Sequence, residues 1–243
     1  MPETRSFVDL HTHSEASFDS LSSPAAMVDR ARRLGFTHLA ITDHERIDGA
    51  LRAAEVADGP GGALQVIVGE EIRSRDGDLL GLFLERAVPP GLSAAETSAA
   101  VREQGGLVGL PHPFDGLRSS GGQKAGPRLA ALAAVIDFVE VHNARAYRDA
   151  NPRAATFAQE HGVPGVASSD AHTLSEMGVT TTILPGPFHT ADELRGLLSE
   201  ATLMTGRASY YLRGWTPIAK VVQRVRGNGR IRPATLPPSA GRR

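Results

Sequence analysis

Histidine and carboxylate side chains recur along this chain, each soon after a short apolar run. Imidazole nitrogens and carboxylate oxygens together bind divalent ions such as Zn²⁺, Mn²⁺ or Fe²⁺. The chain contains no cysteine, so a metal site here must be built from these two residue types. The residues that follow the apolar runs are His11, His13, Asp43, His44, Glu70, Glu71, His112, His142, Asn143, Asp170 and His172.

The spacing within two of these groups favours a shared ion. His11 and His13 lie two residues apart, as do Asp170 and His172. Side chains two apart on an extended strand point to the same face, where both can reach one ion. Asp9 continues the first face, and we expect it to orient an imidazole ring rather than bind an ion directly.

Three residues of the pattern have a second interpretation. Asp43 ends a buried strand, where it can manage protons in a reaction or simply cap a helix. His142 can bind an ion, touch a substrate or be a core histidine bonded to a backbone carbonyl. His112 stands between two prolines, which stiffens the loop, and a purely structural turn is the alternative.

Apolar runs alternate with helical stretches from residue 7 to about 203, which predicts an α/β protein with a largely parallel sheet. The carboxyl ends of parallel strands meet at one face, where active sites of such folds are built. We therefore expect the scattered histidines and carboxylates to form one cluster. The predicted strands are 7–11, 38–42, 64–69, 79–84, 107–110, 138–141, 163–167 and 179–184.

Capping residues mark the helix ends and the length bounds the domains. We expect a main domain over residues 1–190, an extension packed on it over 191–225 and a disordered tail over 226–243. Helix starts are predicted at Ser23 with Pro24 and at Asn151 with Pro152, capping boxes at Ser93 with Glu96 and at Thr190 with Glu193, and helix ends at Gly35, Gly105 and Gly162.

Composition argues against several classes of function. Lys and Arg number 26 and Asp and Glu 27, so a net charge of -1 gives no general attraction to duplex DNA or an anionic membrane. Aromatic residues are 5%, too few for the stacking platforms of single-strand binders. No segment resembles a signal peptide or a membrane span, which predicts a soluble, cytoplasmic protein. The oligomeric state is not predicted by the sequence.

Three histidine-rich groups with carboxylates exceed what one tetrahedral ion can use, which predicts two or three divalent ions with a bridging carboxylate. Closely spaced ions activate a shared water as hydroxide and neutralise the oxygens of a phosphoryl group, so we expect hydrolysis of phosphate esters. The sequence has no Gly-x-x-x-x-Gly-Lys loop, no Gly-x-Ser-x-Gly elbow and no His-Glu-x-x-His motif that would indicate another chemistry.

With these residues assembled, the chain resembles the PHP (polymerase and histidinol phosphatase) family of metal-dependent phosphoesterases. The resemblance covers residues 7–185 and implies a distorted (β/α)7 TIM-like barrel with two or three metals, Mn, Fe or Zn, at one end. The matching segments are Asp-Leu-His-Thr-His-Ser (9–14), Phe-Asp-Ser (18–20), Ile-Thr-Asp-His (41–44), Gly-Glu-Glu (69–71), Pro-His-Pro (111–113), Glu-Val-His-Asn (140–143) and Ser-Asp-Ala-His (169–172).

The resemblance also implies a ligand set. Glu71 would bridge the first ion to a second ion held by His112, and Glu70 would be only its neighbour. Family members often have a further histidine in the next strand, where this chain has Asp78, and His142 is a further candidate for the second ion. The first ion would be held by His11, His13, Glu71 and Asp170, and a third by Asp19, His44 and His172.

Four cationic residues stand near the predicted site. Arg145 is the first choice for binding phosphate, because it lies soon after the strand-end residue Asn143 and a guanidinium can donate two hydrogen bonds. The other three are interpreted equally well as solvated charges in loops. They are Arg73, Arg118 and Lys124.

The predicted activity is hydrolysis of phosphomonoesters or nucleotide phosphates. On resemblance, 3',5'-bisphosphorylated nucleosides or short RNA 5' ends are favoured as substrates over histidinol phosphate. Two alternatives remain, an amidohydrolase-like metal enzyme, although no lysine ends a strand, and a metal-bearing accessory module without catalysis.

Overall fold

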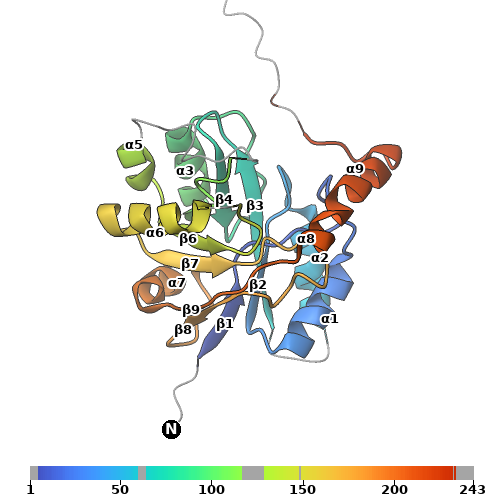
Figure 1. Ribbon diagram of the computed structural model, residues 1–243, viewed down its shortest axis with the longest axis horizontal. Coiled ribbons are helices and arrows are strands. Elements are labelled where there is room, and N and C mark those ends of the chain that lie inside the picture. The colour runs from blue at the N-terminus through green and yellow to red at the C-terminus, as the bar shows by residue number, and fades with distance from the viewer. Residues whose placement is uncertain (1–4, 60–63, 117–128, 148, 232, 234–243) are drawn as a thin grey trace, which may run out of the picture.

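We describe the protein from a computed structural model, which defines residues 5–59, 64–116, 129–147, 149–231 and 233. Nine strands form one curved sheet in the order β7-β6-β5-β4-β3-β2-β1-β8-β9, and helices lie around its outside (Figure 1). The strands are β1 (Ser6–Asp9), β2 (His38–Ile41), β3 (Gln65–Arg73), β4 (Asp78–Leu82), β5 (Leu107–Leu110), β6 (Phe138–Asn143), β7 (Gly165–Ser168), β8 (Thr181–Leu184) and β9 (Thr202–Met204).

The helices in the described part of the chain surround the sheet and continue beyond it at the C-terminal end (Figure 1). They are α1 (Pro24–Leu34), α2 (Asp48–Ala57), α3 (Ala94–Arg102), α5 (Leu129–Ala133), α6 (Ala150–His161), α7 (Ala191–Leu197), the 3-10 turn η2 (Leu198–Glu200), α8 (Tyr210–Arg213) and α9 (Trp215–Val225).

The sheet curls into a nearly closed barrel. Its two ends approach each other at Thr182 of β8, whose hydroxyl accepts a hydrogen bond from the amide of Ala167 at 2.8 Å and donates one to the carbonyl of the same residue at 2.9 Å. A side chain thus satisfies backbone groups of β7 that a neighbouring strand would otherwise pair. The α/β barrel expected from the sequence is confirmed.

The direction of the strands differs from the expected, largely parallel order. The pairs β1–β2, β2–β3, β5–β6 and β6–β7 are parallel, whereas β3–β4, β4–β5, β1–β8 and β8–β9 are antiparallel. β3 and β4 form a hairpin with Arg73 opposite Asp78. A hairpin needs only a short turn, so no crossover helix separates these two strands.

Most of the predicted helix ends are confirmed. Ser23 caps α1, both capping boxes are formed, and Gly35 and Gly162 end α1 and α6 in the left-handed conformation that glycine adopts without strain. The start at Asn151 is wrong, because α6 begins one residue earlier and Asp149 is the cap. The side chain of Asn151 instead accepts a hydrogen bond from the backbone amide of Asn143.

The barrel interior is apolar up to the level of the site. Phe138 of β6 is fully buried there. It packs against Gly109 of β5 so closely that a Cβ built at residue 109 would lie 2.3 Å from the ring. The missing side chain on β5 therefore makes room for the ring at the centre of the core.

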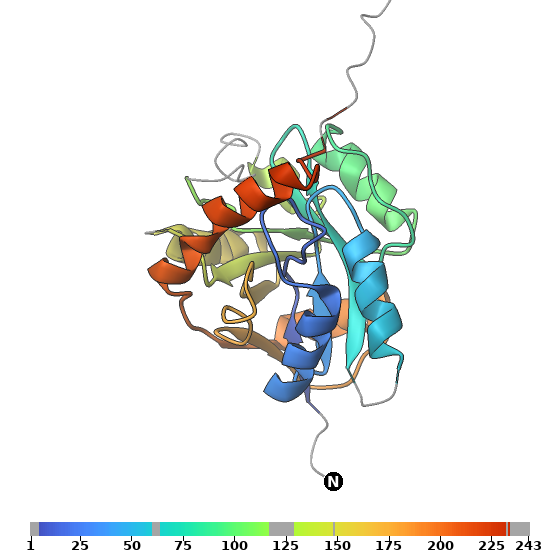
Figure 2. The ribbon, with the colours of Figure 1, turned by 90° about the vertical axis from the view of Figure 1, so that its right-hand side faces the viewer.

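The C-terminal segment crosses the molecule beside the loop that follows β1 (Figure 2). Residues 226–231, the first part of the tail that the sequence predicted to be disordered, are among the described residues. Arg230 makes a two-point ion pair with Glu45, with Nη2 2.9 Å from Oε1. The rest of the expected tail, 232 and 234–243, lies outside the described residues. Among the described residues, no helix has the length and apolar character to cross a bilayer.

Candidate metal centre

Histidines and carboxylates from separate strand ends converge at one end of the barrel. Their potential ligand atoms fall into three overlapping groups, each within 4.8 Å. The groups are His13, Asp19, His44 and His172; His11, His112 and Asp170; and His11, His13 and Glu71. The cluster predicted from strand-end positions is therefore present, with eight of the nine expected ligand residues in it.

Glu71, near the end of β3, lies at the centre of the cluster. Its Oε1 is 3.2 Å from Nε2 of His112. Its Oε2 is 3.4 Å from Nε2 of both His11 and His13 and 3.2 Å from Nδ1 of His44. The two oxygens of one carboxylate thus face different histidines, which is the arrangement that a bridging ligand requires.

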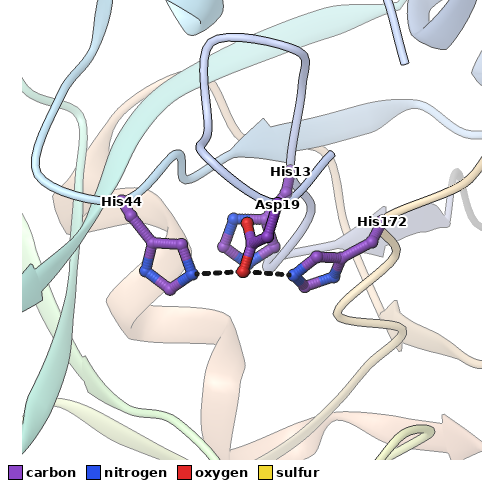
Figure 3. A group of neighbouring side chains, drawn as sticks. All are labelled: His13, Asp19, His44 and His172. Atoms are coloured by element: carbon purple, nitrogen blue, oxygen red, sulfur yellow. Dashed lines mark ion pairs between the residues drawn. The ribbon is translucent and has the colours of Figure 1, made fainter. Parts of the chain in front are cut away.

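Asp19 lies between two histidine rings (Figure 3). Its Oδ2 is 3.3 Å from Nε2 of His44 and 3.4 Å from Nε2 of His172. Its Oδ1 is buried without a hydrogen-bond partner among the described residues. A buried carboxylate oxygen without a partner is costly, and a cation at this position would remove that cost.

Hydrogen bonds from Nδ1 orient two of the histidine rings. Nδ1 of His11 donates to Oε1 of Glu140 at 2.8 Å, and Nδ1 of His172 donates to the carbonyl of Asp170 at 2.8 Å. In each ring the other nitrogen, Nε2, then faces the cluster, where it can bind an ion when it carries no proton. Nε2 of His11 lies only 3.0 Å from Nε2 of His13, a distance at which two lone pairs repel unless a proton or a cation lies between them.

Glu140 and Asn143 of β6 have roles that the sequence pattern did not reveal. Oε2 of Glu140 accepts from the amide of His112 and from Nδ2 of Asn143, both at 2.8 Å. Asn143 also donates to Oδ2 of Asp170 at 3.1 Å. Both residues were within a quoted motif, but no spacing rule separates a ligand from the residue that orients it.

The charges inside the cluster compensate one another. Burial opposes charge on His11 and His44, but neighbouring carboxylates outweigh it and raise the pKa of these rings to about 10 and about 9. Burial, and then the charges of the other rings, lower the pKa of His13, whereas burial and then Arg145 lower that of His172 to about 4. Against burial, the charge and hydrogen bond of His11 lower the pKa of Glu140 to about 2.

Three of the four described residues other than glycine that have a positive φ lie at or near the cluster, and the fourth, Phe83, does not. Glu45, His112 and Asp170 have φ angles of 55°, 29° and 53°, a region that residues other than glycine rarely occupy. All three directly follow or lie near strand ends that carry the cluster. Such strain persists only where surrounding contacts fix it, and it is typical of functional sites.

A cavity of about 440 Å³ opens over the cluster. A second cavity of about 400 Å³, lined by Leu21, Leu174 and Trp215 among others, adjoins it and shares Asp19 and His172 with it. The residues around the first cavity are Phe18, Asp19, His44, Glu71, Asp78, His112, Gly116, Arg145, Asp170, His172, Thr216, Lys220 and Arg230.

Arg145 is the predicted cationic residue that the structure brings to the cavity. Its Nη1 lies 3.3 Å from Oε1 of Glu176, and its Nη2 donates to Thr216 at 2.7 Å. Arg73 is not among the described residues that line the cavity, and Arg118 and Lys124 lie outside the described residues. Lys220 and Arg230 of the C-terminal segment line the cavity as well, and no local sequence motif predicted either residue.

The predicted roles of Asp43, Asp9 and His142 are not supported by the geometry. Asp43 is buried away from the cavity lining, and its oxygens accept from the amide and hydroxyl of Ser14 at 2.7 and 2.6 Å. Asp9 accepts from the backbone amides of His11 and Ser169, so it fixes the chain and not an imidazole.

His142 is also displaced from the cluster. Its Nε2 donates to the carbonyl of Gly206 at 2.7 Å, and its Nδ1 accepts from Asn151 at 3.3 Å, so both ring nitrogens are occupied. The physical cause is a bulge in the pairing with β7 between Glu140 and His142. The bulge turns the second side chain away from the face that the first one occupies.

Comparison with known proteins agrees with this geometry. A model of the PHP domain matches residues 9–120, and a model described as PHP-associated matches residues 148–203. The chain belongs to the PHP family. An uncharacterized protein of Methanocaldococcus jannaschii is 34% identical to it over 146 residues, 56% of this chain and 81% of that protein.

Solved structures share the PHP fold at low sequence identity. One is a two-domain protein of Bacteroides vulgatus that contains a predicted PHP-like metal-dependent phosphoesterase, with a TM-score of 0.68, 20% identity and coverage of 84% of this chain and 65% of that one. Another is the lesion-specific endonuclease Q of Pyrococcus furiosus, with a TM-score of 0.62, 18% identity and coverage of 83% and 58%. An endonuclease Q was also solved with a 27-mer duplex carrying an abasic lesion, so the likeness gives no support to the sequence-based exclusion of duplex DNA.

Proposed function

We propose that this PHP protein hydrolyses small phosphate monoesters at two or three divalent ions held by the cluster. The observation that carries the proposal is the position of Glu71, whose two oxygens face His112 on one side and three further histidines on the other. One carboxylate between several imidazole nitrogens, in a cavity whose lining includes Arg145, Lys220 and Arg230, suits a phosphoryl group better than a neutral amide.

The donor set fits borderline ions, Mn, Fe or Zn, because it mixes nitrogen and carboxylate oxygen and contains no sulfur. We assign His11, His13, Glu71 and Asp170 to a first ion and Glu71 with His112 to a second. Asp19, His44 and His172 would hold a third, which His13 also approaches. When bound, such ions supply a nucleophilic hydroxide at neutral pH and compensate the charge of the phosphoryl oxygens.

The surrounding residues would bind and orient the ester. Arg145 is held by Glu176 and Thr216 at the cavity wall, so its guanidinium is already fixed and loses little freedom when an anion binds. Lys220 and Arg230 lie over the ring of Phe18, with 5.4 and 5.3 Å to its centre, and line the same cavity. We do not assign to Asp43 the proton-handling role expected from the sequence, because both of its carboxylate oxygens accept hydrogen bonds from Ser14.

For the substrate, we favour a phosphorylated nucleoside, of the 3',5'-bisphosphate type, or the 5' end of a short RNA. The adjoining cavity lined by Leu21, Leu174 and Trp215 gives room for an organic group beside the phosphoryl site. Histidinol phosphate is the alternative, and duplex DNA is a further candidate because endonuclease Q shares the fold.

The test joins metal content to phosphate release on one preparation. Purified protein is analysed for Mn, Fe and Zn and then assayed for inorganic phosphate, with strand cleavage read on a gel. The panel is a 3',5'-bisphosphorylated nucleoside, a 5'-phosphorylated RNA oligonucleotide, histidinol phosphate and a duplex with an abasic site. Stoichiometric metal with turnover of the nucleotide substrates supports the proposal, whereas a preference for histidinol phosphate or the duplex reverses the choice of substrate.

A matched pair of variants separates the cluster from its surroundings. His112→Ala removes a ring that faces Glu71, and His142→Ala removes one that lies on the neighbouring strand β6 but is bonded to Gly206. We expect His112→Ala to lose metal and turnover, and His142→Ala to keep both. An enzyme that stays fully active and fully loaded after His112→Ala contradicts the assignment of the site.

A further inference from the structure

Helix α9 contains one buried polar side chain on a largely exposed surface. Trp215, Val221 and Val225 of this helix are 55%, 63% and 84% exposed, whereas Gln223 is 2% exposed. A glutamine is rarely buried unless its amide is hydrogen-bonded, so its partners explain its position.

The partners of Gln223 are carbonyl groups of the loop that follows β1. Its Nε2 lies 2.6 Å from the carbonyl of Glu15, 2.7 Å from that of Ser20 and 3.1 Å from that of Ser17. Residues 15–20 form no regular helix or strand, and no backbone amide of the described residues donates to these three carbonyls. Figure 2 shows α9 lying across the loop.

Asn228 binds the same loop from the end of the helix. Its Nδ2 donates to the carbonyls of Ala16 at 2.9 Å and Glu15 at 3.2 Å. Its Oδ1 accepts from Nη1 of Arg46 at 2.7 Å, and the same Nη1 donates to the carbonyl of Ala16. Two amide side chains of the C-terminal segment therefore hold the backbone of one loop.

That loop carries one side of the metal cluster. It contains Asp19, which lies between His44 and His172, and Ser17, whose hydroxyl is 3.2 Å from Nδ1 of His13 and accepts from the amide of His44. All four residues of the group in Figure 3 are thus in contact with the loop or belong to it.

We infer that Gln223, assisted by Asn228, is a positioning residue that sets the geometry of the Asp19 ion site through the loop 15–20. The inference rests on the proposed metal centre and goes beyond it, because it makes the C-terminal segment part of the site. Ions at Glu71 and His112 would be held by residues at other strand ends of the barrel, and His13 is the one assigned ligand among them that this loop contacts through Ser17.

The experiment is a Mn²⁺ titration of the metal-stripped, full-length chain by calorimetry. Asp19→Asn first identifies which binding step belongs to the Asp19 site. Gln223→Met keeps the length of the side chain and removes both amide donors, and Arg224→Met, at an exposed neighbouring position of α9, is the matched control. Circular dichroism of each variant shows whether it is folded, and Asn228→Ala replaces Gln223→Met if the latter is not.

We expect Gln223→Met to weaken the Asp19 step by about tenfold or more, in the range seen when residues that orient metal ligands are removed, and to leave the other steps within about twofold. Arg224→Met should match the wild type at every step. Equal weakening of all steps, or no change in the Asp19 step, overturns the inference. A wild-type chain that binds no ion at all rejects the proposed function itself, and that result is seen before any variant is compared.

Discussion

Glu140→Gln tests whether a residue that touches no ion controls the metal centre. Both carboxylate oxygens of Glu140 accept hydrogen bonds, Oε1 from Nδ1 of His11 and Oε2 from the amide of His112 and Nδ2 of Asn143, all at 2.8 Å. A glutamine at this position has one oxygen and one NH₂ group. Its oxygen can stay with the two donors at Oε2, which places the NH₂ group against Nδ1 of His11.

The substitution changes which nitrogen of His11 carries the proton. An NH₂ group at Nδ1 can form a hydrogen bond only if Nδ1 accepts, and the ring must then carry its proton on Nε2. Nε2 is the atom that faces His13 and Glu71, so the proton would block ligation. Loss of such an orienting partner lowers metal affinity about 10–100-fold, which is about 1.4–2.7 kcal/mol.

The assay is Mn²⁺ binding and turnover of the preferred substrate, measured with the unfolding free energy of the metal-free protein. Every donor around residue 140 keeps a partner after the tautomer changes, but the buried ion pair with His11 is lost, so we expect the metal-free variant to fold with a stability lower by about 3–5 kcal/mol. Wild-type metal affinity in Glu140→Gln would refute this account of His11. A loss of folding in place of a loss of metal would show that Glu140 acts on the fold.

Three further predictions concern other parts of the chain. Burial lowers the pKa of His38 below its usual 6.5, so its neutral ring stabilises the fold above that pH and the stabilisation is lost as the pH falls through the lowered pKa. His38→Gln, which can still donate to the carbonyl of Phe188, should therefore show a shallower fall of unfolding free energy below pH 6.5, and equal slopes would contradict this. Gly109→Ala should cost about 1–3 kcal/mol in thermal unfolding, because the new methyl group meets the ring of Phe138, and an unchanged melting temperature would mean that the core yields. Asp43→Asn should keep turnover within about tenfold, whereas the 10²–10⁴-fold loss typical of a general acid or base would restore the catalytic role predicted from the sequence.

Strand-end position predicted the members of the cluster other than Asp19, because ligands at strand ends depend on local geometry, whereas Asp19 was expected from the family resemblance alone. His11 with His13 needed only the alternation of an extended chain. The same spacing did not bring Asp170 and His172 to one ion, because Asp170 has a φ of 53° and the two side chains fall in different groups. His142 failed the same rule, since a bulge changes the alternation without any signal in residue type. Lys220 and Arg230 could not be predicted either, because their place at the cavity depends on how a distant helix packs on the loop after β1.

The hairpin of β3 and β4 explains why Asp78 stands where the family resemblance suggested a ligand position. In an all-parallel barrel, the first residue of a strand lies at the end opposite the active site. Here β4 is antiparallel to β3, with Asp78 opposite Arg73, so the start of β4 lies at the same end as Glu71 and the cavity. Burial and then the charge of Glu71 raise the pKa of Asp78 to about 7, while Nη2 of Arg230 lies 3.9 Å from its Oδ1. A reversal of one strand therefore brings a carboxylate, and with it a cation from the C-terminal segment, to the edge of the metal centre.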